Sequence, residues 1–327
     1  MAQVGTDLAK AADILNQGGI VAIPTETVYG LAGNALEADV VRQIFEVKAR
    51  PAYNPLIVHI GRRQQLLQYV QDIPAEAQIL GQHFWPGPLT MILPKKPNIP
   101  DIVTAGLSSV AIRMPNHPMA LSLLQELDFP LAAPSANPFG YISPTTAEHV
   151  SAQLGDKIPY ILDGGACRHG LESTILSFQQ GTPVLLRFGA ITPEVIEEVL
   201  GKKVEIRPTT SEMPKGPGML PYHYAPKTSI TLVSDMGKAL TGKNLECIGI
   251  ISFDETHDEV SLAHQMVLSP SADLHEAGRR LYHALRLMDK LDLDLILVER
   301  LPDHGLGLTI NDRLEKASAR KHQSTNE

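Results

Sequence analysis

Cationic side chains stand at the ends of predicted strands and helices in the first two thirds of this chain. Lys48 and Arg50 close a predicted helix, Arg113 lies in an apolar strand, and Arg187 lies near the end of another strand. The chain has a formal net charge of −8, so these cations do not belong to a generally basic surface. A bound polyphosphate needs several cations, with bidentate contacts from arginine and a point charge from lysine. The pattern therefore predicts one shared anion-binding pocket.

A threonine-rich segment, Pro24-Thr25-Glu26-Thr27, follows a short apolar strand. A strand that ends in such a turn presents hydroxyls and backbone N–H groups at its carboxyl end, where open α/β sheets bind their ligands. The alternative is a turn whose hydroxyls only cap the next helix. On its own, the segment favours that alternative.

Arg113 lies within the apolar stretch Val110–Met114. A buried cation needs a partner, because an unpaired charge is costly to remove from water. A substrate carboxylate would supply that partner. A structural ion pair with Glu26 or Asp163 is the alternative, and the sequence leaves both open.

Small and polar residues follow another predicted strand, in Ala133-Pro134-Ser135-Ala136-Asn137. Small residues let a ligand approach the backbone, and the amide of Asn137 both donates and accepts hydrogen bonds. An ordinary Asx turn is the alternative. Further along, Ser143-Pro144 is typical of an N-cap followed by proline in the first helical turn, a place that also favours phosphate.

Common nucleotide-binding and metal-binding motifs are not found. Gly165 and Gly170 have P-loop spacing, but Leu171-Glu172 replace the required Lys-Ser/Thr pair. The two cysteines, Cys167 and Cys247, are far apart and lie near no paired histidines, which argues against a zinc site or a disulfide scaffold. For Cys167 we expect an inert thiol, because a neighbouring histidine on a loop rarely has the geometry of a base.

Composition narrows the class of protein. With 327 residues and 43% hydrophobic content, the chain is long enough for two globular domains. We expect no membrane span and no secretory signal, and the few cysteines fit a reducing compartment, so the expected location is cytoplasmic. The sequence pI of about 5.8 argues against strong direct binding of nucleic acid.

Periodicity predicts a mixture of strands and helices. Helices are expected at 7–17, at 40–47 and from Thr192-Pro193 onward, and strands at 19–24, 56–60, 89–93, 110–114, 131–133, 160–162, 174–178 and 184–188. This mixture indicates an α/β sheet without a strict βαβ repeat.

A proline-rich segment divides the chain. We expect a first domain at 1–206, a semi-rigid linker at 207–228 and a second domain at 229–327. In the second domain the patterns predict strands at 230–233, 248–253 and 293–298, with an amphipathic helix at 272–291. These elements suggest a small Rossmann-like α/β unit.

Taken together, the motifs resemble the YrdC-type threonylcarbamoyl-adenylate synthases. The matching strings are PTETVYGL, KARPAYNPLIVHI, SSVAIRMP, APSANPFGYISPT, DGG with LESTI, and LLRFGAI, within about 13–200. PGMLPYHYAP and GLGLTINDRL resemble the longer, two-domain form of that family. One departure is Ala49, where many relatives carry glycine. The resemblance implies a YrdC-like twisted open mixed sheet with a concave ligand-binding face, plus a smaller Rossmann-like C-terminal domain.

The resemblance also implies an activity. Members condense L-threonine, bicarbonate and ATP into threonylcarbamoyl-AMP and release pyrophosphate, as nucleotidyltransferases. Mg²⁺ is expected with ATP, held mainly by the phosphates, with no metal site on the protein. A downstream threonylcarbamoyl-transferase complex, acting on a tRNA adenosine beside the anticodon, is the implied partner.

Site residues carry over from the resemblance by matching motifs. The catalytic set falls on Lys48, Arg50, Ser135 and Asn137. Threonine contacts fall on Thr27, His59, Arg113, Ala133 and Ser173. ATP contacts fall on Arg50, Asn54, Ser109, Ser135, Ser143, Arg187 and Tyr224, with Tyr222 and His223 as neighbouring candidates in the linker. The resemblance to the longer form implies that 1–206 is the catalytic domain and that the linker closes over the nucleotide as an active-site lid. We expect the second domain to support this closure rather than chemistry.

Two other functions remain open. YrdC-like modules also occur in carbamoyltransferases that make carbamoyl-adenylate, but those chains are much longer and carry zinc fingers that this chain lacks. A double-stranded RNA or tRNA-binding module without catalysis is the other alternative, against which the acidic charge weighs.

Overall fold

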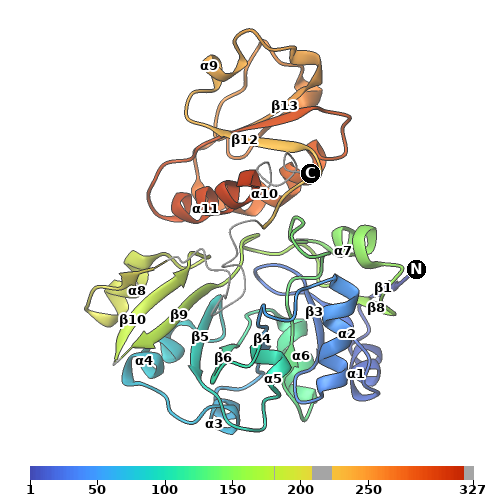
Figure 1. The fold of residues 1–327 in the computed structure, drawn as a ribbon, viewed down its shortest axis with the longest axis vertical. Helices are drawn as coiled ribbons and strands as arrows, with labels where there is room; N and C mark the ends of the chain where they lie inside the picture. Colours follow the sequence, from blue (N-terminus) through green and yellow to red (C-terminus); the bar gives the residue numbers. More distant parts are fainter. Residues whose placement is uncertain (180, 208–222, 320–327) are drawn as a thin grey trace. The chain divides into compact units, whose positions relative to one another are not determined.

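The computed structural model describes residues 1–179, 181–207 and 223–319 (Figure 1). Two compact units are present. The first contains Met1–Phe139, Ser143–Arg168 and the described residues from Glu172 to 207. The second contains Gly140–Ile142, His169–Leu171 and the described residues from 223 to 319.

The first unit is built on a mixed sheet of eleven strands in the order β1-β8-β2-β3-β7-β4-β6-β5-β9-β10-β11. The strands are β1 (Gln3–Gly5), β2 (Val21–Ile23), β3 (Gly30–Asn34), β4 (Ile57–His59), β5 (Leu89–Pro94), β6 (Ser109–Arg113), β7 (Leu131–Ala132), β8 (Tyr160–Leu162), β9 (Thr174–Gln179), β10 (Thr182–Arg187) and β11 (Glu205–Ile206). Parallel and antiparallel pairs both occur, which confirms the predicted mixed α/β class.

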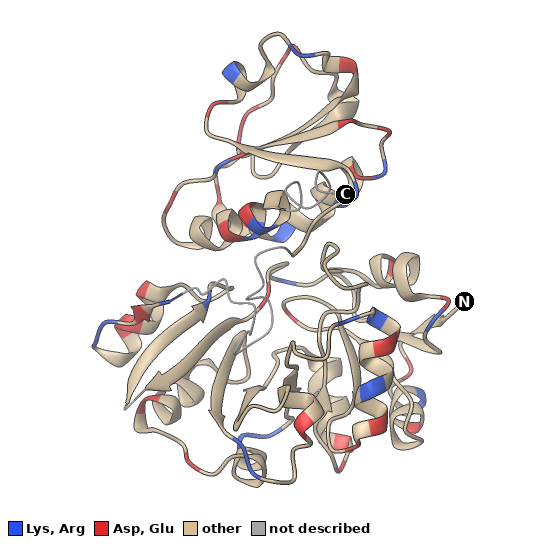
Figure 2. Cartoon of the chain, viewed as in Figure 1, with Lys and Arg blue, Asp and Glu red and all other residues tan. Residues whose placement is uncertain are grey.

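Alternation along the strands sends neighbouring side chains to opposite faces of this sheet. Val58, Met91, Ile112, Leu176 and Leu185 belong to one buried cluster, while their chain neighbours Ile57, Ile92, Ala111, Ile175 and Val184 belong to another. Both faces are therefore covered. Figure 2 shows that charged residues are rare on the strands. Basic and acidic residues both occur along α2 (Ala38–Lys48).

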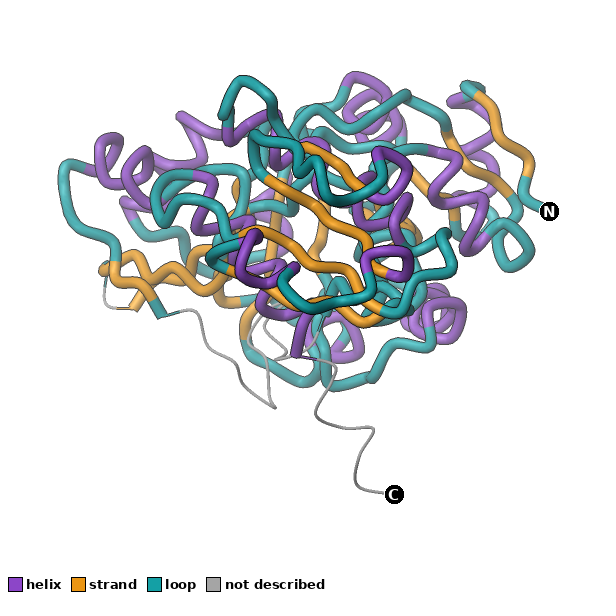
Figure 3. Tube along the Cα trace, turned by 90° about the horizontal axis from the view of Figure 1, so that it is seen from above, coloured by secondary structure: helices purple, strands orange, loops and turns teal. Residues whose placement is uncertain are grey.

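The remaining helices of the first unit are mostly short. They are α1 (Leu8–Asn16), η1 (Arg63–Gln65), α3 (Leu66–Tyr69), α4 (Ala75–Phe84), α5 (Asp101–Thr104), α6 (Pro118–Glu126), α7 (Ala147–Leu154) and α8 (Pro193–Leu200). As predicted, α1 begins after Asp7, whose carboxylate accepts from the backbone N–H of Lys10 at 3.1 Å. Figure 3 shows how loops join these helices and strands. No helix among the described residues is long and apolar enough to cross a membrane.

Two local predictions fail for identifiable reasons. Ser143-Pro144 does not begin a helix; α7 begins at Ala147, and Thr146 is its N-cap. The hydroxyl of Ser143 instead donates to Glu172 at 2.7 Å, so its polar group is used in a tertiary contact. The strand β3 was not predicted because its two glycines hide the strand pattern.

The second unit contains a parallel sheet of four strands in the order β12-β15-β13-β14. Its elements are β12 (Ser229–Val233), α9 (Met236–Leu240), η2 (Leu245–Cys247), β13 (Ile248–Ser252), η3 (Leu262–His264), β14 (Gln265–Val267), α10 (Leu274–Met288), β15 (Leu295–Glu299) and α11 (Leu306–Ser318). The predicted small α/β unit is confirmed, and its sheet is parallel. The periodicity analysis did not predict α9, η2, η3, β14 or α11.

Two short segments from earlier in the chain complete the second unit. The hydroxyl of Tyr141 donates to Asp289, and Arg286 donates to the carbonyl of Ile142 at 2.5 Å. Gly170 has φ +70°, and a Cβ at this position would lie 2.7 Å from the Cα of Arg279. Glycine is therefore required there, both by the backbone conformation and by the close approach.

Candidate functional site

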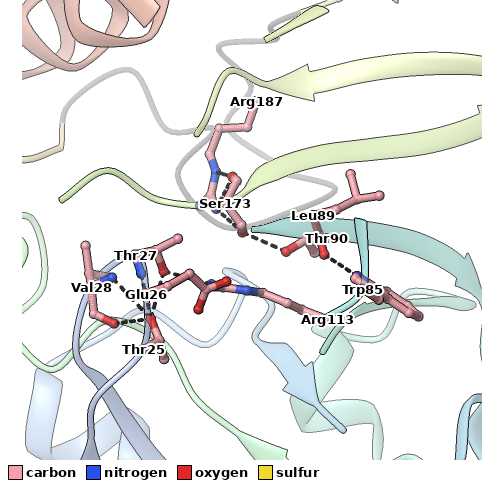
Figure 4. A network of polar contacts seen from close by, with 10 residues as sticks. All are labelled: Thr25, Glu26, Thr27, Val28, Trp85, Leu89, Thr90, Arg113, Ser173 and Arg187. Atoms are coloured by element: carbon pink, nitrogen blue, oxygen red, sulfur yellow. Dashed lines mark hydrogen bonds and ion pairs between the residues drawn. The ribbon is translucent and has the colours of Figure 1, made fainter. Parts of the chain in front are cut away.

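The threonine-rich loop between β2 and β3 is organised by Thr25. Its hydroxyl donates to the carbonyl of Val28 at 2.7 Å and accepts from the N–H groups of Thr27 and Val28 at 3.1 and 3.2 Å (Figure 4). The next element is the strand β3, so the hydroxyls do not cap a helix and that alternative is wrong. The hydroxyl of Thr27 accepts instead from Arg113 Nη1 at 2.9 Å.

Arg113 also forms a buried ion pair with Glu26. Arg113 Nη2 lies 2.7 Å from Glu26 Oε1, and the two side chains are 4% and 3% exposed. Of the two internal partners considered from the sequence, Glu26 is the one found. Asp163 instead accepts from Tyr29 at 3.3 Å and from the N–H of Gly165 at 2.9 Å. Apart from this ion-pair contact between Nη2 and Oε1, both oxygens of Glu26 and the Nε and Nη2 atoms of Arg113 are buried without a hydrogen-bond partner among the described residues.

A second series of polar contacts begins on the strand next to Arg113. Thr90 on β5 is the register partner of Arg113 on β6, and its hydroxyl lies 2.7 Å from that of Ser173. Arg187 Nη2 donates to the carbonyl and hydroxyl of Ser173 at 2.7 and 3.0 Å. Figure 4 shows the series from the threonine-rich loop to Arg187. The structure thus brings Thr27, Arg113, Ser173 and Arg187 into one network.

His59 lies beside Arg113 in the parallel pair of β4 and β6. It is 3% exposed, and its Nδ1 lies 3.2 Å from the carbonyl of Ile57. Burial, followed by the charge of Arg113, lowers the pKa of His59 to about 3. The imidazole is therefore neutral near pH 7 and serves as an uncharged hydrogen-bonding group.

Lys48 forms the centre of a second group of predicted residues. The residue after it, Ala49, takes the left-handed conformation with φ 50°, which ends α2 and turns the chain. Lys48 Nζ then donates to the carbonyls of Ser135 and Asn137, each at 2.5 Å. Among the described residues these neutral oxygens are its partners, and no carboxylate pairs with it. Burial, then the charge of Arg50, holds the pKa of Lys48 well below its ordinary value.

Arg50 holds the turn that leads into β4. Its Nη2 donates to Asn54 Oδ1 at 2.6 Å and to the carbonyl of Pro55 at 2.8 Å, and its Nε donates to the carbonyl of Asn54 at 3.1 Å. The guanidinium lies 5.9 Å from the ring centre of Phe139. Arg50 and Asn54, each predicted to contact ATP, are thus in direct contact with each other.

The polar network around Arg113 and the group of residues around Lys48 meet at the start of β3. Ser135 bridges to Gly30, and a Cβ on Gly30 would lie 3.2 Å from that of Ala133. The N–H of Ala136 donates to the carbonyl of Tyr29 at 2.8 Å. The loop that contains Ser135 and Asn137 therefore runs against the strand that follows Thr27.

The remaining predicted residues are Ser109, in the first unit, and the linker candidates. Ser109 begins β6 and Arg113 ends it, so the two are about 13 Å apart along the strand. Tyr224 belongs to the second unit, where its buried ring lies 5.8 Å from that of Tyr282 and 4.9 Å from the Arg313 guanidinium. These packing contacts lie within the second unit. The other linker candidates are His223, also in that unit, and Tyr222, which lies outside the described residues.

Some polar residues of the region were not identified as site residues from the sequence. Thr25, Thr90 and Glu172 are buried and hydrogen-bonded to predicted residues or their loops. Glu26 was considered only as an ion-pair partner. A buried polar residue in an apolar strand, such as Thr90, is the signal that could have been used.

The chemistry available to the site is electrostatic. Among the described residues, no group of three or more His, Cys, Asp and Glu side chains is placed to hold a metal ion. Burial raises the pKa of the Cys167 thiol, which opposes a nucleophilic role. A cavity of about 690 Å³ is lined by residues including Leu66, Ile73 and Trp85, and by none of the predicted site residues. The four predicted cations each donate hydrogen bonds to acceptors within the protein; they are Lys48, Arg50, Arg113 and Arg187.

Comparisons with known proteins agree with both units. A family model described as "Telomere recombination", covering Sua5, YciO and YrdC proteins, matches residues 13–189, and one described as "Threonylcarbamoyl-AMP synthase, C-terminal domain" matches residues 191–319. The threonylcarbamoyl-AMP synthase of Pyrococcus abyssi (strain GE5 / Orsay) is 42% identical over 325 residues, covering 94% of this chain and 93% of that protein. That of Bacillus subtilis (strain 168) is 43% identical over 321 residues, covering 95% and 92%. The crystal structure of P. abyssi Sua5 complexed with L-threonine has a TM-score of 0.87 at 40% identity, covering 95% of this chain and 94% of that one.

Proposed function

This chain belongs to the threonylcarbamoyl-AMP synthase family, and from that premise we propose that it condenses L-threonine, bicarbonate and ATP into threonylcarbamoyl-AMP with release of pyrophosphate. The relative in P. abyssi was solved with L-threonine, which supports threonine as the amino acid. The product is the activated group used to modify a tRNA adenosine beside the anticodon.

One observation carries the nucleotide part of the proposal. Lys48 is buried on two neutral carbonyls beside Arg50, and their mutual repulsion is part of what lowers the pKa of Lys48. Two neighbouring cations without a carboxylate on Lys48 favour an anion nearby. We assign this place to bicarbonate-derived and phosphate oxygens.

The reaction joins two negatively charged partners. The threonine amine and bicarbonate form a carbamate, and a carbamate oxygen then attacks the α-phosphorus of ATP while pyrophosphate leaves. Repulsion and misalignment form much of the barrier, so fixed cations and hydrogen-bond donors lower it by positioning and electrostatic preorganisation. The protein acts as a nucleotidyltransferase without a covalent intermediate on the protein.

Threonine is assigned to the network around Arg113. The guanidinium binds the carboxylate, while Thr27, Ser173 and the neutral imidazole of His59 supply uncharged hydrogen-bonding groups. Mg²⁺ enters with ATP and is held mainly by phosphate oxygens, since no group of three or more His, Cys, Asp and Glu side chains in the described part of the chain is placed to hold a metal ion. We expect the reaction in the cytoplasm, where ATP and a tRNA-modifying threonylcarbamoyl transferase are available.

The test is pyrophosphate release by the full chain. Protein, ATP and Mg²⁺ are mixed with L-threonine and bicarbonate, and each substrate is omitted in turn. We expect release that requires both threonine and bicarbonate. Release that is indifferent to threonine would contradict the proposal, and RNA binding that falls steeply with salt, without any release, would favour an RNA-binding module instead.

A further inference from the structure

Glu26 has a carboxylate that the protein itself leaves partly unsatisfied. Its side chain is 3% exposed, and Oε1 lies 2.7 Å from Arg113 Nη2. Oε2 has no hydrogen-bond partner among the described residues. A buried carboxylate oxygen without a donor is costly, because removal from water costs free energy that only a hydrogen bond or a cation offsets.

A purely structural ion pair would be expected to use both oxygens. Arginine and a carboxylate commonly meet through two parallel hydrogen bonds, which satisfy the carboxylate on both sides. Here Arg113 divides its contacts between Glu26 and the hydroxyl of Thr27, and its Nε stays unused. One carboxylate oxygen and one guanidinium N–H are thus both available in the same buried place.

The loop holds Glu26 in this position. Residues on both sides of it are fixed by the hydroxyl of Thr25, which bonds to the backbone of Thr27 and Val28. Figure 4 shows the Glu26 carboxylate turned toward the Arg113 guanidinium. Among the described residues, Arg113 is the cation that forms an ion pair with Glu26. The side chains of His117 and Cys167 also interact electrostatically with the Glu26 charge, without an ion pair.

An unused anionic oxygen beside an unused cationic N–H matches a zwitterion. Free threonine has a carboxylate and an ammonium group separated by one carbon atom. We propose that Glu26 binds the α-ammonium group of threonine and accepts its proton, while Arg113 binds the carboxylate. This inference rests on the proposed function, and it adds a residue for the step that precedes attack on ATP.

The step balances without any further reagent. The ammonium N–H bond breaks and its proton passes to Glu26, which becomes a neutral carboxylic acid, while the nitrogen keeps the electron pair. The free amine then attacks the carbon of bicarbonate, a C–N bond forms, and water leaves to give the carbamate. Glu26 returns its proton to solvent when the products depart.

The experiment compares two ligands on the full chain by calorimetry. L-Threonine carries the ammonium group, and 3-hydroxybutanoate has the same carbon skeleton and carboxylate without it. We expect the unmodified protein to prefer threonine. In Glu26→Gln, threonine affinity should fall about 10- to 100-fold, since hydrogen bonds to charged groups contribute roughly 1.5–3 kcal/mol. The analogue should bind as before or better, because Arg113 is freed.

Asp163→Asn is the matched control, because it removes another carboxylate of this unit that has no contact with Arg113. It should keep the preference for threonine. An unchanged preference in Glu26→Gln would overturn the role of Glu26. If that variant does not fold, as judged by thermal unfolding, the unmodified protein decides: equal affinity for both ligands refutes the proposal.

The outcome is separable from the proposed function. Pyrophosphate release by the unmodified protein tests the reaction itself, whatever Glu26 does. Release that persists together with an unchanged ligand preference in Glu26→Gln rejects the role of Glu26 alone. Absence of release from the unmodified protein rejects the reaction.

Discussion

Arg113 and Glu26 form an ion pair of 2.7 Å in which neither side chain is more than 4% exposed. The pair lies between the threonine-rich loop and the polar contacts that run through Thr90 to Ser173 and Arg187. The ion pair satisfies the buried charge of Arg113. In the proposed assignment, a substrate carboxylate shares Arg113 with this internal anion.

Replacing Arg50 should impair catalysis more than folding. Arg50 contacts the side chain of Asn54 and two carbonyls of the turn, and its charge adds to that of Lys48. Loss of one such electrostatic contact typically costs on the order of 2–4 kcal/mol in the transition state. For Arg50→Ala we expect turnover lowered roughly 10²- to 10³-fold in a pyrophosphate assay.

Arg50→Lys is the control, because it keeps the charge but loses the planar fork. Its turnover should lie between those of the unmodified protein and Arg50→Ala. All three proteins should have similar unfolding temperatures. Full activity of Arg50→Ala would remove Arg50 from the mechanism.

Anion binding should bring a proton to Lys48. Its pKa is held low by burial and by Arg50, and a bound anion favours the charged form and so raises that pKa. We expect MgATP binding at mildly alkaline pH to be accompanied by proton uptake, measured by calorimetry in buffers of different ionisation enthalpy. Lys48→Met should lack this uptake. The same uptake in the variant would show that the proton goes elsewhere.

His59 should make folding sensitive to acid. Its folded-state pKa is about 3, compared with an ordinary value of 6.5. Between these values the unfolded chain binds a proton that the folded chain does not, so the free energy of unfolding decreases as pH falls through this window. The His59 contribution is at most about 1.4 kcal/mol per pH unit.

Denaturant unfolding between pH 7 and pH 4 checks this dependence. His59→Gln keeps a polar side chain but cannot titrate, so its stability should depend less steeply on pH. Equal slopes for the two proteins would refute the assignment.

Removing the second unit should damage the chain that remains. Ile142 and Leu171 are buried, and both belong to the segments that pack in the second unit. A chain that ends at Arg207 keeps β11 but exposes these side chains and leaves Tyr141 without Asp289. We expect a lower unfolding temperature, weaker ATP binding and slower turnover than in the full chain. Matching values would show that the second unit supports neither fold nor ligand binding.

The strand and helix pattern was predictable where apolar periodicity is strong. The helix after Asp7 and the strands around Arg113 and Ile250 follow from local sequence. β3 could not be predicted because glycine carries no apolar side chain to reveal alternation. Ser143 was misassigned because its hydroxyl bonds to Glu172, a partner distant in sequence.

The site was partly predictable for the same reason. Lys48 and Arg50 are two residues apart at a helix end, so the sequence predicts that they lie close together. That Lys48 would donate to the carbonyls of Ser135 and Asn137 depends on tertiary packing, which local sequence does not encode. The choice of Glu26 over Asp163 as the partner of Arg113 is also a tertiary result.

The central claim is that this chain joins threonine, bicarbonate and ATP in one acyl-adenylate. Mass spectrometry of a mixture with ATP, Mg²⁺, L-threonine and ¹³C-labelled bicarbonate tests it most directly. We predict a labile threonylcarbamoyl-AMP that carries the label and forms only when every component is present. An adenylate that lacks the label, or that forms without threonine, would contradict the claim.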